Sequence, residues 1–488
     1  MLAIEQLLVI IALLLLAAVA ASKASSRFGV PSLLLFLGLG MLLGADGPGN
    51  VYFDDATLSQ QVGTVALAFI LFSGGLDTDW KAIRPVLGAG LLLANLGVLI
   101  STMLFGALAL LVFGLSWLEG LLLGAIISST DAAAVFSVLR MSNVHLRGNL
   151  EPLIELESGS NDPIAVFLTI GLTALLIDPA APLLGLVPLF FWEMLVGAAL
   201  GLTFGWLMTW LINRVHLDVE GLYPIISIAA VLLTFGAAVW AHGNGFLAVY
   251  VAGITMGNQR LVHRQSLARF HDALAWLMQI VMFLTLGLLV FPSQLVAVIG
   301  AGLVGALVLT LGIRPLAVFV ALAFTRYSPA EKFMISWAGL RGAVPIVLAT
   351  YPLIAGVEQA SFMFNIVFFI VLASVLFQGT TIRRVADLLK LNTGSPQQNH
   401  HSLEFIPAVS DQSRVCDLVV PVGTPAAGMT IRDLGLPRNV LVILIERNGD
   451  QIVPSGATVI HEDDHLRVLA DPTQLHELNA RLLAAHQK

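Results

Sequence analysis

The sequence predicts an α-helical polytopic membrane protein with a small α+β domain at its C-terminal end. Of its 488 residues, 57% are hydrophobic and 11% are charged, whereas soluble domains contain about 25% charged residues. The charge deficit is confined to residues 1–391, which form the expected membrane domain, and residues 403–488 have an ordinary soluble composition. The polar residues 392–402 between them are expected to be a linker.

Thirteen apolar runs are candidates for membrane-spanning helices, each of which needs about 20 apolar residues. The ninth run is short and follows the glycine-rich "HGNG", whereas the fourth and eleventh are long and are expected to tilt. The runs lie at 2–21, 28–45, 60–76, 85–113, 117–139, 149–177, 188–212, 222–241, 246–257, 272–291, 295–325, 330–355 and 361–390.

The loop charges predict the orientation of these spans. If the N-terminus lies outside, all fifteen loop cations fall on the inner side, where the positive-inside rule expects them. The sequence therefore predicts a multi-pass protein of the cell inner membrane with a cytoplasmic C-terminal domain. The inner cations are Lys23, Arg27, Lys81, Arg84, Arg140, Arg147, Arg214, Arg260, Arg264, Arg269, Arg326, Lys332, Arg383, Arg384 and Lys390.

The fifth span contains the polar sequence "SSTDAAAV", residues 128–135, near its middle. Its hydroxyls and carboxylate can satisfy backbone groups that an unwound turn would free in the membrane. Asp131 has two readings: it caps a half-helix, or it belongs to a cation site together with Thr130.

The twelfth span contains "WAGLRGAVP", in which Gly339, Gly342 and Pro345 weaken the helix around Arg341. Breaks in the fifth and twelfth spans are seven spans apart, which favours two inverted six-helix repeats, spans 1–6 and 8–13, joined by the seventh. Transporters place their binding site where such broken helices cross, near the bilayer midplane.

The motif "ESGSNDP", residues 157–163, places ionisable groups at the start of the sixth span. Glu157 and Asn161 share one helix face, and Ser158 and Asp162 share the next. Carboxylate, amide and hydroxyl oxygens are hard ligands that suit a small monovalent cation. The sequence therefore predicts a cation- and proton-binding site at this motif.

Two of these charges are expected to form a structural ion pair, Glu157 with Arg341, because each needs a partner in lipid. Arg314, which precedes Pro315, is expected to lie near the inner surface and extend its guanidinium to water. Asp162 is then left without a cationic partner. A carboxyl group in that position favours its neutral form, so either a proton or a metal cation can neutralise it, which is the chemistry of an electroneutral exchanger.

These motifs resemble those of the NhaP-type cation–proton antiporters, relatives of the eukaryotic sodium/proton exchangers. The resemblance covers nearly all of 1–391 and rests on "ESGSNDP", "STDAAAVFSVL", "GLRGAVPIVLA", "LFSGGLDTDW" and "VLFQGTTIRRVADLL". It implies a two-fold symmetric homodimer, each subunit having a core domain and a dimerisation domain that move like an elevator.

The resemblance also implies roles for individual residues. Asp162 carries the cation and the proton, with Thr130, Glu157 and Ser158 near the ion and Asn161 as the neutral partner of Asp162. The monovalent cation is expected at Asp162, Ser158 and Thr130, with Arg341 bracing Glu157.

The C-terminal domain shows a different pattern. "RVCDLVVPV", "VLVILIER" and "HLRVLA" predict strands, and "TIRDLGLP" and "PTQLHELNARLLAAH" predict short helices. The domain resembles the C-terminal RCK module of potassium channels and transporters, which implies regulation by a small ligand, a nucleotide among the candidates. The alternative is an inert dimerisation domain.

Other function classes fit the sequence less well. The net charge of −7 gives no basic footprint for a nucleic acid polymer, and the single cysteine gives no cysteine metal cluster or intrachain disulfide. A channel would need a carbonyl-lined filter or rings of charge, and an enzyme would need a nucleophile–base pair or a metal site. No resident cofactor is expected. The RCK-like domain favours K⁺ as the exchanged cation, with Na⁺ as the alternative.

Overall fold

The structure is a computed structural model that divides into two compact units, Met1–Gln398 and Asn399–Lys488. It describes residues 4–28, 31–142, 144–178, 180, 182–215, 217 and 219–393 of the first unit. In the second unit it describes residues 414–420, 424, 426–436, 440–447, 450–462 and 464–470. Most of the predicted linker, 394–402, lies outside the described residues.

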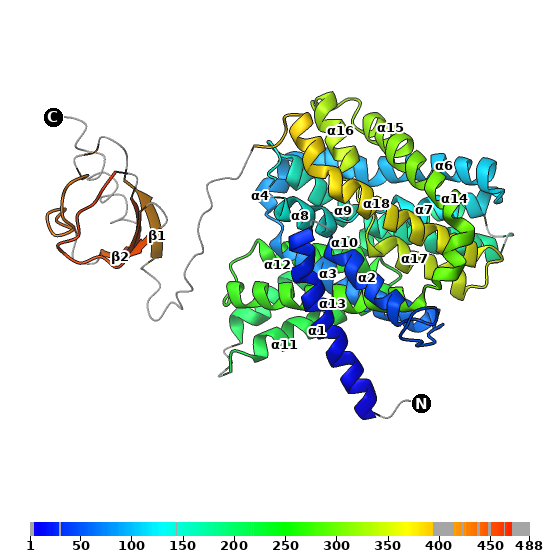
Figure 1. The fold of residues 1–488 in the computed structure, drawn as a ribbon, viewed down its shortest axis with the longest axis horizontal. Coiled ribbons are helices and arrows are strands. Elements are labelled where there is room, and N and C mark those ends of the chain that lie inside the picture. The colour runs from blue at the N-terminus through cyan, green and yellow to red at the C-terminus, as the bar shows by residue number, and fades with distance from the viewer. Residues whose placement is uncertain are drawn as a thin grey trace. The chain divides into compact units, whose positions relative to one another are not determined.

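All named secondary-structure elements in the described part of the first unit are helices, and a helix, a chain of short helices or a helix pair occupies each of the thirteen predicted runs. Figure 1 shows this unit with α9 near the centre of the view and α1 extending from its edge. The helices are α1 (Ile4–Phe28), α2 (Ser32–Leu43), α3 (Ala56–Asp77), α4 (Trp80–Ile83), η1 (Arg84–Val86), α5 (Leu87–Leu92), η2 (Leu93–Gly97), α6 (Val98–Leu108), η3 (Ala109–Phe113), α7 (Trp117–Ser128), α8 (Ala132–Met141), α9 (Leu150–Ile177), η4 (Leu183–Gly185), α10 (Leu186–Arg214), α11 (Leu222–Trp240), α12 (Gly245–Gly257), α13 (Arg264–Leu289), α14 (Pro292–Val308), η5 (Leu309–Ile313), α15 (Arg314–Ala321), α16 (Pro329–Trp337), α17 (Ala343–Ile354) and α18 (Ala360–Leu388).

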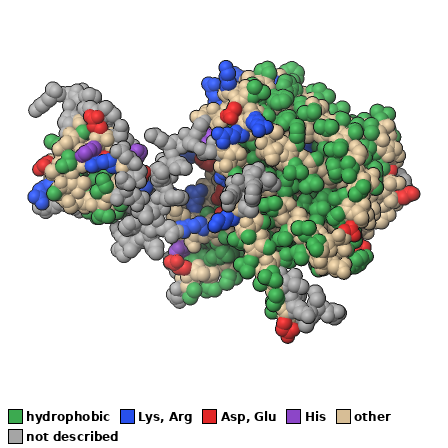
Figure 2. All heavy atoms as spheres, in the orientation of Figure 1, with side chains coloured by type: hydrophobic (Ala, Val, Ile, Leu, Met, Phe, Trp, Pro, Cys, Tyr) green, Lys and Arg blue, Asp and Glu red, His purple; other side chains and the backbone are tan. Residues whose placement is uncertain are grey.

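Eight helices of the described residues are long and apolar enough to cross a membrane, and the bent pair α7–α8 makes a ninth. The helices α2, α12 and α17 are apolar but shorter. Apolar side chains cover much of the helical unit, as a lipid-facing surface requires (Figure 2). These observations confirm the predicted class of polytopic helical membrane protein.

The spans differ strongly in how deeply they are buried. In the most apolar window of α9, 67% of the residues are buried inside the unit, whereas the corresponding value for the η4–α10 span is 6%. The motif predicted to bind the cation therefore lies on the most enclosed of the long spans. This position keeps its polar groups away from lipid, where they would be costly.

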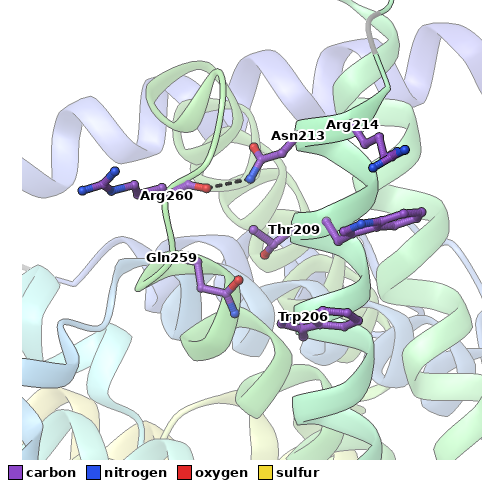
Figure 3. Close-up of a pocket in the computed structure, with 7 residues that line it drawn as sticks. Trp206, Thr209, Asn213, Arg214, Gln259 and Arg260 are labelled. Atoms are coloured by element: carbon purple, nitrogen blue, oxygen red, sulfur yellow. Dashed lines mark hydrogen bonds between the residues drawn. The ribbon is translucent and has the colours of Figure 1, made fainter.

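Close backbone approach fastens the exposed helix α10 to α12. A Cβ atom added to Gly201 would lie 2.5 Å from the carbonyl oxygen of Ala248, so only glycine allows this contact. At the end of α10, the Asn213 side chain donates to the carbonyl of Arg260 over 2.7 Å (Figure 3). It also accepts from the backbone N–H of Val262 over 2.9 Å. These bonds tie α10 to the loop that follows α12.

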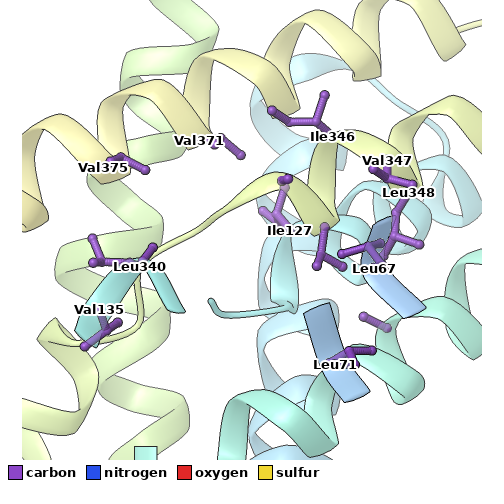
Figure 4. Close-up of a cluster of buried hydrophobic side chains, with 14 of the residues drawn as sticks. Leu67, Leu71, Ile127, Val135, Leu340, Ile346, Val347, Leu348, Val371 and Val375 are labelled. Atoms are coloured by element: carbon purple, nitrogen blue, oxygen red, sulfur yellow. The ribbon is translucent and has the colours of Figure 1, made fainter. Parts of the chain in front are cut away.

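Apolar side chains from several helices enclose the centre of the unit. Leu67 and Leu71 of α3, Ile127 of α7 and Leu348 of α17 are all buried there (Figure 4). Leu340, in the segment between α16 and α17, belongs to the same cluster. The broken helices described below are therefore packed against buried apolar side chains.

The described part of the second unit is an antiparallel sheet in the order β1-β4-β2-β3. Its strands are β1 (Arg414–Val419), β2 (Leu441–Arg447), β3 (Asp450–Ile452) and β4 (His465–Ala470). The three predicted strands are confirmed, and the short β3 was not predicted. The buried core of this second unit includes Val420, Ile445, Ile460 and Val468.

The predicted helix at 430–437 is wrong over its described part, because residues 431–435 form turns; residue 437 lies outside the described residues. The backbone N–H groups of Ile431 and Arg432 donate to the carbonyls of Thr458 and Gly456, and pairing with a neighbouring segment replaces the helical pattern. The second predicted helix, 472–486, lies outside the described residues.

The sheet unit contains a two-pronged ion pair that makes its stability depend on pH. Arg447 Nε and Nη2 each lie 2.8 Å from a different oxygen of the fully buried Asp464. Burial alone would raise the pKa of Asp464, but the hydrogen bonds from Arg447 and from the backbone N–H of His461 outweigh it and hold the pKa below its ordinary value.

We predict that Asp464→Asn destabilises this unit by about 1.5–3 kcal/mol at neutral pH, the range for hydrogen bonds to charged groups. Because the folded-state pKa is lowered, the contribution is present above the unfolded-state pKa and disappears as pH falls through the folded-state value. Hydrogen exchange of the β2 and β4 amides in the full chain measures both effects. A difference between wild type and variant that stays the same at acid pH would contradict this account.

Candidate functional site

The fifth span is broken at the predicted place. Helix α7 ends at Ser128 and α8 begins at Ala132, with Ser129 and Asp131 in extended conformations between them. The Asp131 carboxylate accepts from the backbone N–H of Ala134 over 3.0 Å and so caps the N-terminus of α8. The prediction of an unwound turn in this span is confirmed.

The twelfth span is also broken where its glycines predict. Helix α16 ends at Trp337 and α17 begins at Ala343. Side chains of α18 satisfy the backbone groups that the break frees: Gln378 Nε2 donates to the Trp337 carbonyl over 3.0 Å, and the Arg341 N–H donates to Ser374 Oγ over 3.2 Å. The interruption is thus a built feature of the fold.

The two breaks cross each other. The backbone N–H of Asp131 donates to the carbonyl of Leu340 over 2.9 Å. A Cβ atom on Gly342 would lie only 1.7 Å from Oδ2 of Asp131, so glycine is required at this crossing. Gly342 occupies the N-cap position of α17 and has no side chain with which to cap it. The Asp131 carboxylate lies against Gly342 and also caps α8, so it lies at the positive ends of two helices.

The motif on α9 binds the first break through its side chains. Ser158 Oγ donates to the Thr130 carbonyl over 2.7 Å and accepts from the Ala132 N–H over 2.8 Å. Asn161 Nδ2 donates to the Thr130 hydroxyl over 2.6 Å. Both residues therefore supply partners to backbone or side-chain groups of the unwound turn.

Asp162 lies next to this network, and one hydrogen bond reaches its carboxylate within the described residues. Ser129 Oγ donates to Asp162 Oδ1 over 2.5 Å, and the residue is 6% exposed. Within the described residues, no lysine, arginine or histidine lies within ion-pair distance of it. Asp162, Ser158 and Asp131 line a cavity of about 90 Å³. This cavity is large enough for a partly hydrated monovalent ion.

The predicted ion pair between Glu157 and Arg341 is wrong. Arg314 Nη2 lies 2.6 Å from Glu157 Oε1, and the side chains are 4% and 3% exposed. Arg314 is thus buried rather than near the surface, and it reaches Glu157 because Gly339 has no side chain: a Cβ there would lie 2.6 Å from Arg314 Nε. Arg341 is also buried, and it lies close enough to Glu157 and Arg314 to interact electrostatically with both. Its Nε and Nη1 atoms have no hydrogen-bond partner among the described residues.

The structure therefore divides the predicted site residues into two groups. The cavity is lined by Asp162, Ser158 and Asp131. The other three, Thr130, Asn161 and Glu157, do not line it and instead form hydrogen bonds or an ion pair beside the crossing. The prediction of site residues missed Ser129 as the donor to Asp162. It also missed Glu155, Tyr250 and Gln279, which line the cavity. The seven-residue spacing between Glu155 and Asp162 is the signal that could have found Glu155.

Comparisons with known proteins agree with this architecture. The family model described as "Sodium/hydrogen exchanger, transmembrane" matches residues 11–388. This chain belongs to the sodium/hydrogen exchanger family. The TrkA-C domain model matches residues 417–483. The resemblances drawn from the motifs of both domains are confirmed.

Relatives of this family match nearly the whole chain. A K⁺/H⁺ antiporter NhaP2 from Shewanella sp. (strain ANA-3) is 38% identical over 473 residues, which cover 96% of this chain and 82% of the relative. A K⁺/H⁺ antiporter NhaP from Alkalimonas amylolytica is 36% identical over 484 residues, covering 99% and 84% respectively.

A solved structure has the same fold. The sodium proton antiporter MjNhaP1 from Methanocaldococcus jannaschii superposes with a TM-score of 0.67 at 24% identity, over 79% of this chain and 99% of that chain. The helical unit of this exchanger therefore has a fold that a solved structure shares.

The revised ion pair gives a direct prediction. Arg314→Leu leaves Glu157 buried without its counter-charge and should destabilise the protein by about 3–5 kcal/mol. Adding Glu157→Gln should recover most of that loss, and Arg326→Leu, which removes an exposed loop cation, is the matched control. Thermal unfolding in detergent measures these proteins together with Arg341→Leu, alone and combined with Glu157→Gln. If Glu157→Gln instead rescues Arg341→Leu, the pairing with Arg314 is overturned.

Proposed function

We propose that this exchanger carries K⁺ one way and H⁺ the other, using Asp162 as the single binding group for both. The observation that carries the proposal is a buried carboxyl group with no cationic partner among the described residues, placed in a small cavity at crossed, broken helices. Burial makes an unneutralised carboxylate costly, so the group favours states in which a proton or a cation neutralises it.

The surrounding groups suit an alkali cation. The Ser158 hydroxyl and the Asp162 and Asp131 carboxylates bring oxygen atoms to the same cavity. The Ser129 hydroxyl donates to Asp162 Oδ1 and fixes the carboxylate, while Oδ2 has no hydrogen-bond partner among the described residues. Thr130, which the sequence places at the ion, has its hydroxyl oxygen occupied by Asn161 and approaches the ion only after a rearrangement of this pair.

Mutually exclusive occupancy accounts for coupling. One carboxylate holds either a proton or one monovalent cation, so each half-cycle moves one positive charge and the exchange is electroneutral. The empty, charged form is disfavoured in the low-dielectric interior, which suppresses uncoupled movement. A channel, the rival class, would conduct the cation without this proton requirement.

K⁺ is the proposed cation because the two relatives described above are named K⁺/H⁺ antiporters and because a TrkA-C domain follows the helical unit. Na⁺ is the second candidate, supported by the family description and by a neighbour named as a sodium proton antiporter. Both ions use the same oxygen ligands, so the cavity chemistry alone does not choose between them.

The setting of the protein is proposed from its charges and its family. We propose a homodimer in the cell inner membrane, with the N-terminus outside and the TrkA-C domain in the cytoplasm. The one-sided distribution of loop cations supports this orientation, and the exposed apolar face of α10 supports an intersubunit contact there. A small regulatory ligand of the TrkA-C domain, such as a nucleotide, completes the proposal, with no resident cofactor for transport.

Asp162→Asn should abolish exchange of K⁺ and of Na⁺, because the amide neither ionises nor releases a proton. Purified protein in proteoliposomes with an internal pH dye measures the exchange, with each chloride salt added in turn. Glu220→Gln, a charge removal in an exposed loop, is the control and should leave transport unchanged. Residual exchange by Asp162→Asn would contradict the mechanism. Wild-type activity with Na⁺ but not with K⁺ would mean that Na⁺ is the exchanged cation.

A further inference from the structure

Glu155 is a second carboxylate on the same face of α9 as Asp162. The two residues are seven positions apart, which is two helical turns or about 10 Å along the axis. Ser158 and Gly159 lie between them on that face, and all four residues line the same cavity. Glu155 therefore points along the route that leads to the proposed carrier group.

Two cavities meet at Glu155. The cavity of about 90 Å³ that contains Asp162 and a larger one of about 300 Å³ share six lining residues, Ile70, Gly74, Ala132, Ala133, Glu155 and Gln279. Among the described residues, Glu155 is the only ionisable one that borders both cavities. The larger cavity also contains Asp77, Arg140 and Asp272, at the ends of α3 and α8 and in the first half of α13.

The larger cavity lies toward the proposed cytoplasmic side. Asp77 is close in the chain to Lys81, and Arg140 and Arg264 belong to the loop cations that define that side. An ion that enters from the cytoplasm therefore passes the larger cavity first, then Glu155, and then reaches Asp162.

An unpartnered buried hydroxyl points to a ligand between the two carboxylates. Tyr250 is 4% exposed and lines the cavity of Asp162. Its hydroxyl has Thr78 and Glu155 as polar neighbours, but none of the described residues forms a hydrogen bond of good geometry with it. Its ring lies on Gly159, where a Cβ atom would be 2.6 Å from the hydroxyl oxygen. A buried hydroxyl costs free energy unless it has a partner, and a cation or its water shell would supply one.

We propose that Glu155, with the Tyr250 hydroxyl, forms a second cation station between the cytoplasmic cavity and Asp162. This inference rests on the proposed function and adds a residue to it. Thr78 Oγ1 donates to Glu155 Oε1 and holds the carboxylate at the junction of the two cavities. The station attracts an incoming cation electrostatically and passes it on, but it does not carry the cation across the membrane.

Comparing KM with kcat separates two roles for Glu155: attracting the incoming K⁺ and carrying it across the membrane. Removing one negative charge about 10 Å from the bound ion weakens its binding by roughly two- to fifteen-fold over effective dielectric constants of 80 to 20. Glu155→Gln should therefore raise KM for K⁺ at the proposed cytoplasmic face by that factor and leave kcat within about twofold. Glu155→Asp should restore most of the affinity, and Glu151→Gln, one turn away and outside both cavities, is the matched control.

Three outcomes overturn the station. One is an unchanged KM in Glu155→Gln, a second is loss of kcat in a variant that folds normally, and the third is an equal KM increase in Glu151→Gln. Stabilisation of the purified protein by K⁺ in thermal unfolding supplies a binding constant that needs no transport. If the wild type transports nothing, the proposed function fails, while a weaker K⁺ stabilisation of Glu155→Gln still supports the station and an equal one still excludes it.

Discussion

The crossing of two unwound helices is the constraint on which this structure depends. In a membrane, every freed backbone group must find a partner inside the protein. Here the Asp131 N–H finds the Leu340 carbonyl, and the Trp337 carbonyl finds Gln378. Because backbone groups of each break form hydrogen bonds with the other break or with a neighbouring helix, the interrupted spans are stable. Their polar groups create a space lined by oxygen atoms at the centre of an otherwise apolar unit.

The charges around the crossing perform separate tasks. Glu157 and Arg314 neutralise each other in the dry interior, and Asp131 lies at the positive ends of α8 and α17. These arrangements leave Asp162 as the carboxyl group of the crossing that no fixed cation neutralises within the described residues. Because Glu157 and Asp131 already have positive partners, a proton or an alkali cation is needed only to neutralise Asp162.

Much of this site could be predicted because its signals are local. Glycine, hydroxyls and a carboxylate within an apolar run mark a break wherever the run folds, so both breaks were predicted correctly. The partner of Glu157 was not, because two long arginine side chains occur in later spans and only the packing against Gly339 decides which one reaches it. Glu155 was missed because a carboxylate near the end of a span usually faces water. Only the structure shows that it lines the two cavities. In the second unit, pairing with residues 456–458 overrides the local helix signal of 430–437.

Competition between the two ions on the wild-type protein tests the central claim most directly. If a proton and K⁺ occupy the same carboxylate, the apparent KM for K⁺ should rise about tenfold for each unit by which pH falls below the titration range of that group, with the maximal rate reached at saturating K⁺. Initial rates in proteoliposomes over a range of pH and K⁺ concentrations provide this measurement. A KM for K⁺ that does not change with pH would mean that both ions bind together, and the account of a single shared carboxylate would be contradicted.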